Sequence, residues 1–247
     1  HKIQDVVLKD GQPAELSQVV APEPGWREKL CAYLNASPQP ESPHFHHFLL
    51  TTDVPGLQVC YNTMQRGGKI VGCIFTTDGA SVGYINSTFV PREMRQLGIA
   101  THLMAALEDD FIGRDGQVRF FTTRTGSPAV GLFEKFGYRA VWERSGRTGM
   151  EQFYDGTTWE DYFLADPASV QIEDITWAHW NPHRALMWTR KGDGYHPLDG
   201  DFLTRIRESA TDGGTRWKGL VIPDGRLVGT AVLRPQNRWG EGSAPSC

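Results

Sequence analysis

Short apolar runs separated by glycine-containing turns dominate the middle of the chain. Residues 57–64, 69–76 and 81–90 are each of strand length and rich in β-branched and aromatic side chains. The turn at 66–69 contains Gly-Gly, and the turn at 78–79 is Asp-Gly. Glycine supplies the positive φ angles that tight hairpin turns need. The pattern therefore predicts an antiparallel meander of three strands.

A helical period follows this meander. Residues 96–111 place apolar side chains four positions apart, which is typical of a helix with one buried face: Ile99, Leu103, Leu107 and Phe111. A strand is expected at 118–122. A strand that follows a strand and a helix in this way pairs in parallel through a crossover, so we expect it beside 81–90.

A second helix is expected to begin at Ser127-Pro128, because serine caps a helix start and proline suits its first turn. Gly137 is expected to end it. Residues 138–143 and 150–154 then follow as two last strands. This order of elements indicates an α+β fold, in which a mixed, mostly antiparallel sheet is flanked by helices.

The segment before the meander carries weaker signals. Residues 1–20 are expected to be extended, and the apolar spacing at 26–34 predicts a short helix. Residues 36–43 hold three prolines and are expected to form a loop. An extended stretch is expected at 44–51.

The composition changes near residue 155, because six of the eight tryptophans lie beyond it. Gly225-Arg226-Leu227-Val228-Gly229 also matches Gly68-Lys69-Ile70-Val71-Gly72, and a strand and a turn precede each. We therefore expect residues 1–155 to form one domain and 156–247 a smaller α+β unit. Two interpretations of the match stay open: an incomplete second copy of the first unit, or a hairpin sequence that is common in proteins.

Charge and cysteine usage exclude several classes of function. The net charge of −4 over 247 residues gives no electrostatic case for nucleic acid or an anionic membrane. No apolar run approaches the roughly 20 residues of a membrane span, so we expect a cytoplasmic protein with no membrane partner. The four cysteines show no C-x-x-C spacing, which favours free thiols over a zinc or redox motif.

The stretch Arg95-Gln96-Leu97-Gly98-Ile99-Ala100 carries the strongest chemical signal. It follows a predicted strand and opens a predicted helix. The first N–H groups of a helix have no partner inside the helix, and the helix dipole is positive at that end. Together these features form an anion site that suits a pyrophosphate.

In this context the Arg-x-x-Gly-x-Ala pattern resembles the acyl-CoA-binding loop of the GCN5-related N-acetyltransferase (GNAT) family. Residues 126–138 resemble the second motif of that family, at the family's order and spacing. The resemblance implies acetyl-CoA or another acyl-CoA as cosubstrate, and no metal. It implies that the following residues bind CoA, the first two through backbone pairing with pantetheine: Phe89, Val90, Arg95, Gln96, Leu97, Gly98, Ile99, Ala100, Thr101, Ser127 and Phe133.

Three positions depart from the family pattern. Gln96 stands where glycine is common, and Gly126 stands where an asparagine often contacts pantetheine. Phe133 stands where a tyrosine often protonates the departing CoA thiolate. The last departure leaves the general acid unassigned. Ser127 or Tyr138 could replace it, although a helix cap and strand packing are the plainer roles for these two residues.

The general base is equally open, because the strand before the loop carries no carboxylate. His44, His46 and His47 lie in the segment that usually shapes the acceptor pocket in the family. Alternation along an extended segment would put His44 and His46 on one face, and an imidazole suits amine deprotonation. We expect one of these histidines to be the base. Ordinary packed or surface histidines are the plainer alternative, and a zinc site is the weakest one.

The resemblance implies direct attack of an amine on the thioester of a bound acyl-CoA, in a ternary complex. A small-molecule or peptide amine is the expected partner, and a homodimer is compatible with the sequence. Two rival functions stay open. One is thioester chemistry on a carrier protein. The other is a non-catalytic CoA-binding module with a tryptophan-rich partner surface, although tryptophans at this density usually pack in a core.

Overall fold

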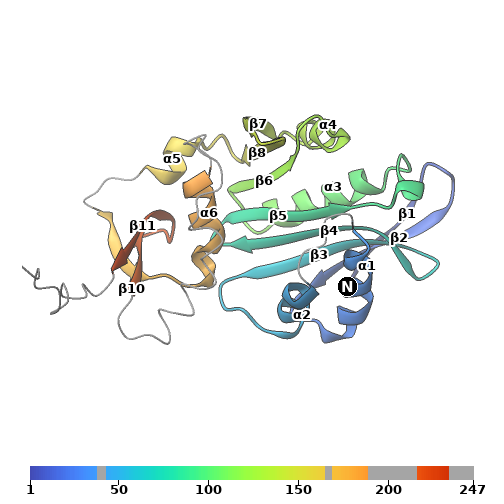
Figure 1. Cartoon of the computed structure of the whole chain (residues 1–247), viewed down its shortest axis with the longest axis horizontal. Coiled ribbons are helices and arrows are strands. Elements are labelled where there is room, and N and C mark those ends of the chain that lie inside the picture. Colours follow the sequence, from blue (N-terminus) through green and yellow to red (C-terminus); the bar gives the residue numbers. More distant parts are fainter. Residues whose placement is uncertain (38–42, 165–168, 189–215, 234–247) are drawn as a thin grey trace, which may run out of the picture.

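A computed structural model describes residues 1–37, 43–164, 169–188 and 216–233. Two sheets and their covering helices make up these parts (Figure 1). The larger sheet has eight strands in the order β1-β2-β3-β4-β5-β6-β8-β7. Their bounds are β1 Lys2–Val7, β2 Pro13–Val20, β3 Gln58–Arg66, β4 Lys69–Gly79, β5 Val82–Phe89, β6 Val118–Arg124, β7 Arg139–Arg144 and β8 Arg147–Phe153.

The predicted meander is confirmed as β3-β4-β5, with each neighbouring pair antiparallel. The predicted crossover is confirmed too, because β6 pairs with β5 in parallel. The two last strands form the β7–β8 hairpin, and β8 inserts between β6 and β7. An N-terminal hairpin, β1–β2, completes the sheet by pairing β2 with β3. The α+β fold class is therefore confirmed.

Helices cover both faces of the larger sheet. The predicted apolar stripe of α3 is fully buried, together with residues of β4, β5 and β6 and of helix α4. Helices α1 and α2 supply Leu30, Leu34, Leu49 and Leu50 to a separate apolar cluster. The helix bounds are α1 Arg27–Asn35, α2 Pro43–Thr51, α3 Ile99–Ile112, α4 Pro128–Lys135, α5 Trp159–Phe163 and α6 Trp180–Trp188, with short 3-10 turns at η1 Pro24–Trp26, η2 Arg92–Met94 and η4 Trp177–His179.

One local prediction is wrong: residues 44–51 are not extended but belong to helix α2. Pro43 is the first residue of that helix, where its missing N–H costs nothing. Leu49 and Leu50 are both fully buried, and Phe45 packs four residues before the first of them. This spacing is helical, and histidines between the apolar residues concealed it. His44 and His46 therefore do not share a face as they would in a strand.

A second, three-stranded sheet follows in the order β11-β10-β9, from strands β9 Gln171–Asp174, β10 Arg216–Val221 and β11 Leu227–Leu233. Both pairings are antiparallel. Among the described elements, β9, η4, α6, β10 and β11 follow one another in the same order of types as β2, η1, α1, β3 and β4. Helix α2 lies between α1 and β3, and the corresponding residues 189–215 of the second unit lie outside the described part. Residues 201–209, whose sequence predicts a helix, lie outside the described residues.

The second sheet packs against the first unit. Trp180, Trp217 and Leu227 share an apolar cluster with Tyr61 and Phe75 of the larger sheet. Asn181 of α6 is fully buried and donates from its side-chain amide to the backbone oxygen of Thr77, at 2.5 Å. The described tryptophans at these positions are therefore core residues, as their plainer interpretation predicted. None of the described helices combines the length and hydrophobicity that a membrane crossing requires.

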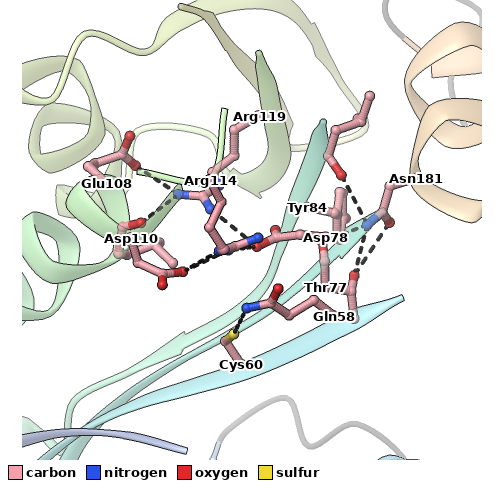
Figure 2. Close-up of polar contacts among 12 residues, drawn as sticks. Gln58, Cys60, Thr77, Asp78, Tyr84, Glu108, Asp110, Arg114, Arg119 and Asn181 are labelled. Carbon is pink, nitrogen blue, oxygen red and sulfur yellow. Dashed lines mark hydrogen bonds and ion pairs between the residues drawn. The ribbon is translucent and has the colours of Figure 1, made fainter. Parts of the chain in front are cut away.

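A buried group of charged residues ties α3 to the sheet (Figure 2). Arg119 of β6 is completely buried and donates to Glu108 of α3 at 3.3 Å and to the backbone oxygen of Leu107 at 3.2 Å. Its other terminal nitrogen lies 3.6 Å from a carboxylate oxygen of Asp78, on β4. Tyr138 and Tyr154 donate their hydroxyl groups to Glu108. Both buried carboxylates thus have cationic or hydroxyl partners.

Gly83 makes room for this group. A Cβ at Gly83 would lie 2.7 Å from Asp78 Oδ1 and 2.8 Å from Arg119 Nε. Gly83 is also the β5 partner of Arg119 in the parallel pairing. The ion pairs therefore lie at the point where β5 and β6 join, and only a glycine fits between them.

His46 points into the core rather than into solvent. Its side chain is only 1% exposed, and its Nδ1 lies 3.2 Å from the hydroxyl of Tyr61. The rings of Phe45, Tyr61 and Phe75 surround it. Burial lowers the pKa of His46 to about 4, so the imidazole is neutral at pH 7. His47, one residue on, is exposed.

His46 should make the protein sensitive to acid. Because its pKa is lower in the folded state, protonation below the unfolded value favours the unfolded chain. Its stabilising contribution is complete above pH 6.5 and falls as the pH drops towards 4. Between pH 7 and 5 the loss should reach about 2 kcal/mol. Urea unfolding at both pH values should show this loss in the wild type and in His47→Gln, but much less of it in His46→Gln. Equal losses in all three proteins would contradict the assignment.

Removing Arg119 should destabilise the fold strongly, because Asp78 and Glu108 would keep their burial and lose a cation. Arg119→Ala is expected to cost roughly 3–5 kcal/mol of unfolding free energy. Arg66→Ala removes a half-exposed partner of Asp10 instead, and is expected to cost at most about 1 kcal/mol. Chemical denaturation at pH 7 compares the two. A cost for Arg119→Ala no larger than that for Arg66→Ala would show that the buried group is not stabilising.

Candidate functional site

A cleft opens where strands β5 and β6 separate. The two strands pair at only three positions, the last of which joins Tyr84 to Phe120. Beyond this point β5 runs on to Phe89 and β6 to Arg124 without pairing with each other, while β5 stays paired with β4 and β6 with β8. The gap leaves strand edges whose backbone groups are available to a ligand that lies between them.

A β-bulge at Asn86 starts the separation. Ile85 pairs with Thr76 and Ser87 with Phe75, so Asn86 is an extra residue with no partner on β4. A bulge bends its strand and increases the local twist. The Asn86 side chain donates to the hydroxyl of Thr77 at 3.0 Å, which holds the bulge against β4. The divergence of the strands is thus built into the backbone.

The cleft has a volume of about 700 Å³. Residues 85–89 of β5 form one wall and residues 121–124 of β6 the other, and the start of α4 closes one side. Arg95, Arg124 and Arg147 also line it. Neither Asp nor Glu occurs among the described lining residues. Thr88 Oγ1 is buried and has no hydrogen-bond partner among the described residues, so a ligand amide in the cleft would satisfy it.

The predicted anion loop lies at the start of α3. Gly98 precedes the helix with φ of +87°, and no side chain caps the helix. The first intrahelical bond runs from the His102 N–H to the Gly98 oxygen at 3.1 Å, so the N–H groups just before His102 point out of the helix end. Gln96 also has a positive φ, of +66°. This conformation explains why glycine suits position 96 better.

Gly72 allows α3 to approach the sheet at the loop. A Cβ at Gly72 would lie 2.3 Å from the Ile99 side chain and 3.1 Å from that of Leu103. Ile99 is the first residue of α3. Gly72, the last residue of the hairpin sequence 68–72, therefore lets the N-terminus of α3, which forms the anion site, pack directly on β4.

Lys9 lies beside the loop, which the sequence did not indicate. Its N–H donates to the Leu97 oxygen at 3.2 Å, and its side-chain Cε would be 3.8 Å from a Cβ placed on Gly98. An exposed ammonium next to a helix start adds to an anion site. Lys9 follows β1, nearly ninety residues before Gly98, so only the fold brings them together.

The backbone oxygens of the two residues expected to pair with pantetheine already accept side-chain hydrogen bonds. Phe89 accepts from the Tyr33 hydroxyl at 3.0 Å, and Val90 accepts from Arg95 Nε at 3.1 Å. Phe89 lines the cleft as expected. Arg95 thus holds the strand end in place as well as lining the cleft.

Helix α4 presents its predicted residues to the cleft. Ser127 is the N-cap by position, but its hydroxyl does not cap the helix and instead lies 3.3 Å from that of Thr123. Phe133 is buried against Phe121, with ring centroids 4.0 Å apart. Tyr138 is buried and bonded to Glu108, outside the cleft lining. Of the candidate acids, Ser127 is therefore the one in the cleft.

The histidines are not brought together with these groups. His46 is enclosed by the aromatic cluster and does not line the cleft. His44 belongs to α2, and its side chain lies outside the described part of the structure. Within that part, no cluster of three or more His, Cys, Asp or Glu side chains could hold a metal ion.

A comparison with protein-family models finds a match within the first unit. Residues 24–138 match the model of the acetyltransferase (GNAT) family. A search of curated proteins finds no significant match.

Several solved structures resemble the chain at low identity. The GNAT domain of S. lividans PAT is 18% identical, with a TM-score of 0.48, over 61% of this chain and 96% of that one. Arabidopsis thaliana NAA60 in complex with acetyl-CoA is 14% identical, with a TM-score of 0.46, over 57% and 99%. A tandem GNAT protein from the clavulanic acid biosynthesis pathway is 14% identical, with a TM-score of 0.45, over 91% and 75%.

The match over residues 24–138 covers the meander, the anion loop and helix α4. The resemblance drawn from residues 95–100 and 126–138 is thereby confirmed, because both segments lie within the part of the chain that matches the acetyltransferase (GNAT) family model.

Proposed function

We propose that the protein transfers an acetyl or other short acyl group from acyl-CoA to an amine. The cleft between β5 and β6 carries this proposal, because it leads from the anion loop to the strand bulge. The CoA pyrophosphate would lie on the N–H groups at the start of α3. Pantetheine would enter between the separated strands, where its amide could form a hydrogen bond with the buried Thr88 Oγ1, which has no partner among the described residues.

Both reactants would be held in line in one complex. The amine nitrogen forms a bond to the thioester carbon, the carbon–sulfur bond breaks, and CoA leaves as a thiolate. One proton leaves the amine and one is taken up by the thiolate. Holding the reactants in place supplies much of the rate, so the proton groups need not be strong.

Ser127 is the residue we propose to deliver the proton to the thiolate. It lines the cleft, and its hydroxyl is not used as a helix cap. For the base, the buried and neutral His46 is a weaker candidate than the sequence indicated, because the aromatic cluster separates it from the cleft lining. A water-mediated base therefore fits the proposal better.

The second unit, 156–247, is proposed to be a partial second copy of the fold. Among its described elements, the order of strand, 3-10 turn, helix and hairpin follows that of β2, η1, α1 and the β3–β4 hairpin in the first unit. Its contacts through Trp180, Asn181 and Trp217 support a structural role next to the first unit. A cytoplasmic location and a homodimer remain predictions.

Acetyl-CoA binding and turnover test the proposal separately. Calorimetry with acetyl-CoA should give a 1:1 complex, and thiol release with a panel of amines should detect turnover. Ser127→Ala should lower kcat roughly 10- to 100-fold with little change in acetyl-CoA affinity, as loss of one acid–base group does. Thr51→Val removes a hydroxyl on α2 that bonds to the backbone of its own helix and lies outside the cleft lining, so it serves as the matched control. Binding without turnover on any amine would favour the CoA-binding module, and absence of binding would exclude both functions.

Lys9 should contribute to CoA affinity. Lys9→Gln removes a charge beside the loop without removing buried surface, and should weaken CoA binding roughly 3- to 10-fold at low salt, less at 0.5 M salt. Lys2→Gln changes a lysine of the same hairpin that pairs with Asp5, so its CoA affinity should match the wild type. Calorimetric titrations at both salt concentrations measure the effect. Identical affinities for the two variants would remove Lys9 from the site.

A further inference from the structure

Three arginines occupy neighbouring positions on β6, β8 and β7, and two of them, Arg124 and Arg147, line the cleft. Arg124 on β6 pairs with Arg147 on β8, and Arg147 pairs with Arg144 on β7. Directly opposed residues of antiparallel strands project from the same face, with Cβ atoms about 5 Å apart. Like charges in such positions repel each other, so this arrangement has a cost that an anion would relieve.

The local sequence fixes this arrangement. Ser145 and Gly146 both have positive φ, at +49° and +71°, and form the two-residue turn between β7 and β8. The Thr125 N–H donates to the Gly146 oxygen at 2.9 Å, which holds the turn to the end of β6. Arg147 also donates to the Thr122 hydroxyl at 3.2 Å. Arg144 and Arg147 therefore stand on a hairpin that is held to the end of β6, the strand that carries Arg124.

No carboxylate of the described residues forms a salt bridge with Arg124 or Arg147. Glu151 is on the same face of β8, but Arg139 binds it at 3.0 Å. Glu143 accepts instead from the hydroxyl of Thr148. Both Arg124 and Arg147 are exposed and line the cleft. A ligand in the cleft would meet two guanidinium groups that no described carboxylate neutralises.

The face on which they stand distinguishes their ligand from the CoA pyrophosphate. On β6, Arg119 and Phe121 point to α3 and α4, as their contacts with Glu108 and Phe133 show. Strand residues alternate, so Thr122 and Arg124 point to the opposite face. The anion loop belongs to α3. The pyrophosphate and the arginines are therefore on opposite sides of the sheet.

An aromatic side chain adjoins the arginines. Trp142 lies over Gly149, whose Cβ would be 2.2 Å from the indole ring, and Gly149 is the partner of Thr122. Position 149 thus has to be glycine for the indole to lie there. This half-buried ring and the cations beside it form a surface suited to a small anionic molecule.

We propose that the acyl acceptor is an amine that also carries a carboxylate or phosphate, and that Arg124 and Arg147 bind this anionic group. The inference rests on the proposed acyl transfer. Guanidinium groups bind both anions through paired hydrogen bonds. With the anion held on this face and CoA entering from the other, the amine would reach the thioester between the strands.

Matched pairs of acceptors test the inference. O-phosphoethanolamine is compared with ethanolamine, and β-alanine with β-alaninamide, by kcat/KM with acetyl-CoA and by calorimetric binding to the CoA-saturated protein. The wild type should prefer the anionic member of at least one pair, roughly 10- to 100-fold. Arg124→Gln with Arg147→Gln should reduce this preference below about 3-fold, through a rise in KM for the anionic amines. Arg27→Gln, on α1, is the control and should keep the preference.

The outcomes separate this inference from the proposed function. Turnover with no preference for anionic amines would overturn the inference and leave acyl transfer standing. Arginine-dependent binding of an anionic amine without turnover would overturn acyl transfer and retain the site. Calorimetry with CoA and dephospho-CoA tests whether the arginines instead bind the 3′-phosphate of CoA. If the arginine variants lose affinity for CoA but not for dephospho-CoA, the arginines bind the cofactor and the inference is wrong.

Discussion

The cleft depends on the buried ion pairs of Arg119. A completely buried guanidinium persists only with anionic partners, and these come from two other elements, Asp78 of β4 and Glu108 of α3. Arg119 itself lies in the middle of the short β5–β6 pairing, opposite Gly83. The ion pairs thus fix two strands and a helix at the base of the cleft (Figure 2). Above that base the bulge at Asn86 lets the strands separate without loosening the fold.

Two glycines place the anion site at a fixed position next to this base of the cleft. Gly72 lets α3 approach β4, and Gly98 adopts the positive φ that begins the helix. Since Ile99 packs on Gly72 and Glu108 binds Arg119, α3 contacts the sheet near both of its ends. The anion site and the cleft therefore keep a constant spacing, which a cofactor with phosphates at one end and a thioester at the other requires.

Local patterns predicted most of the first unit, and long-range contacts account for what they missed. Periodicity and turn glycines located the meander, α3 and α4, because these signals lie within a few residues. Residues 44–51 were mistaken for an extended segment, since histidines between apolar residues hid the helical spacing of Phe45 and Leu49. Lys9, Arg124 and Arg147 belong to no motif. Strand register and hairpin docking alone place them at the site, and neither can be derived from local sequence.

Successive side chains of β6 point to opposite faces of the sheet, and the two faces have different roles. Odd-numbered side chains hold the fold together: Arg119 binds Glu108, Phe121 packs on Phe133, and Thr123 contacts Ser127. Even-numbered side chains near the strand end, Thr122 and Arg124, point away from these helices into the cleft. Substitutions at these exposed positions can therefore change the contacts with a ligand without disturbing the core. If the proposed acyl transfer holds, packing constrains the face of β6 towards α3 and α4, and acceptor specificity would depend on exposed positions of β6 and of the β7–β8 hairpin.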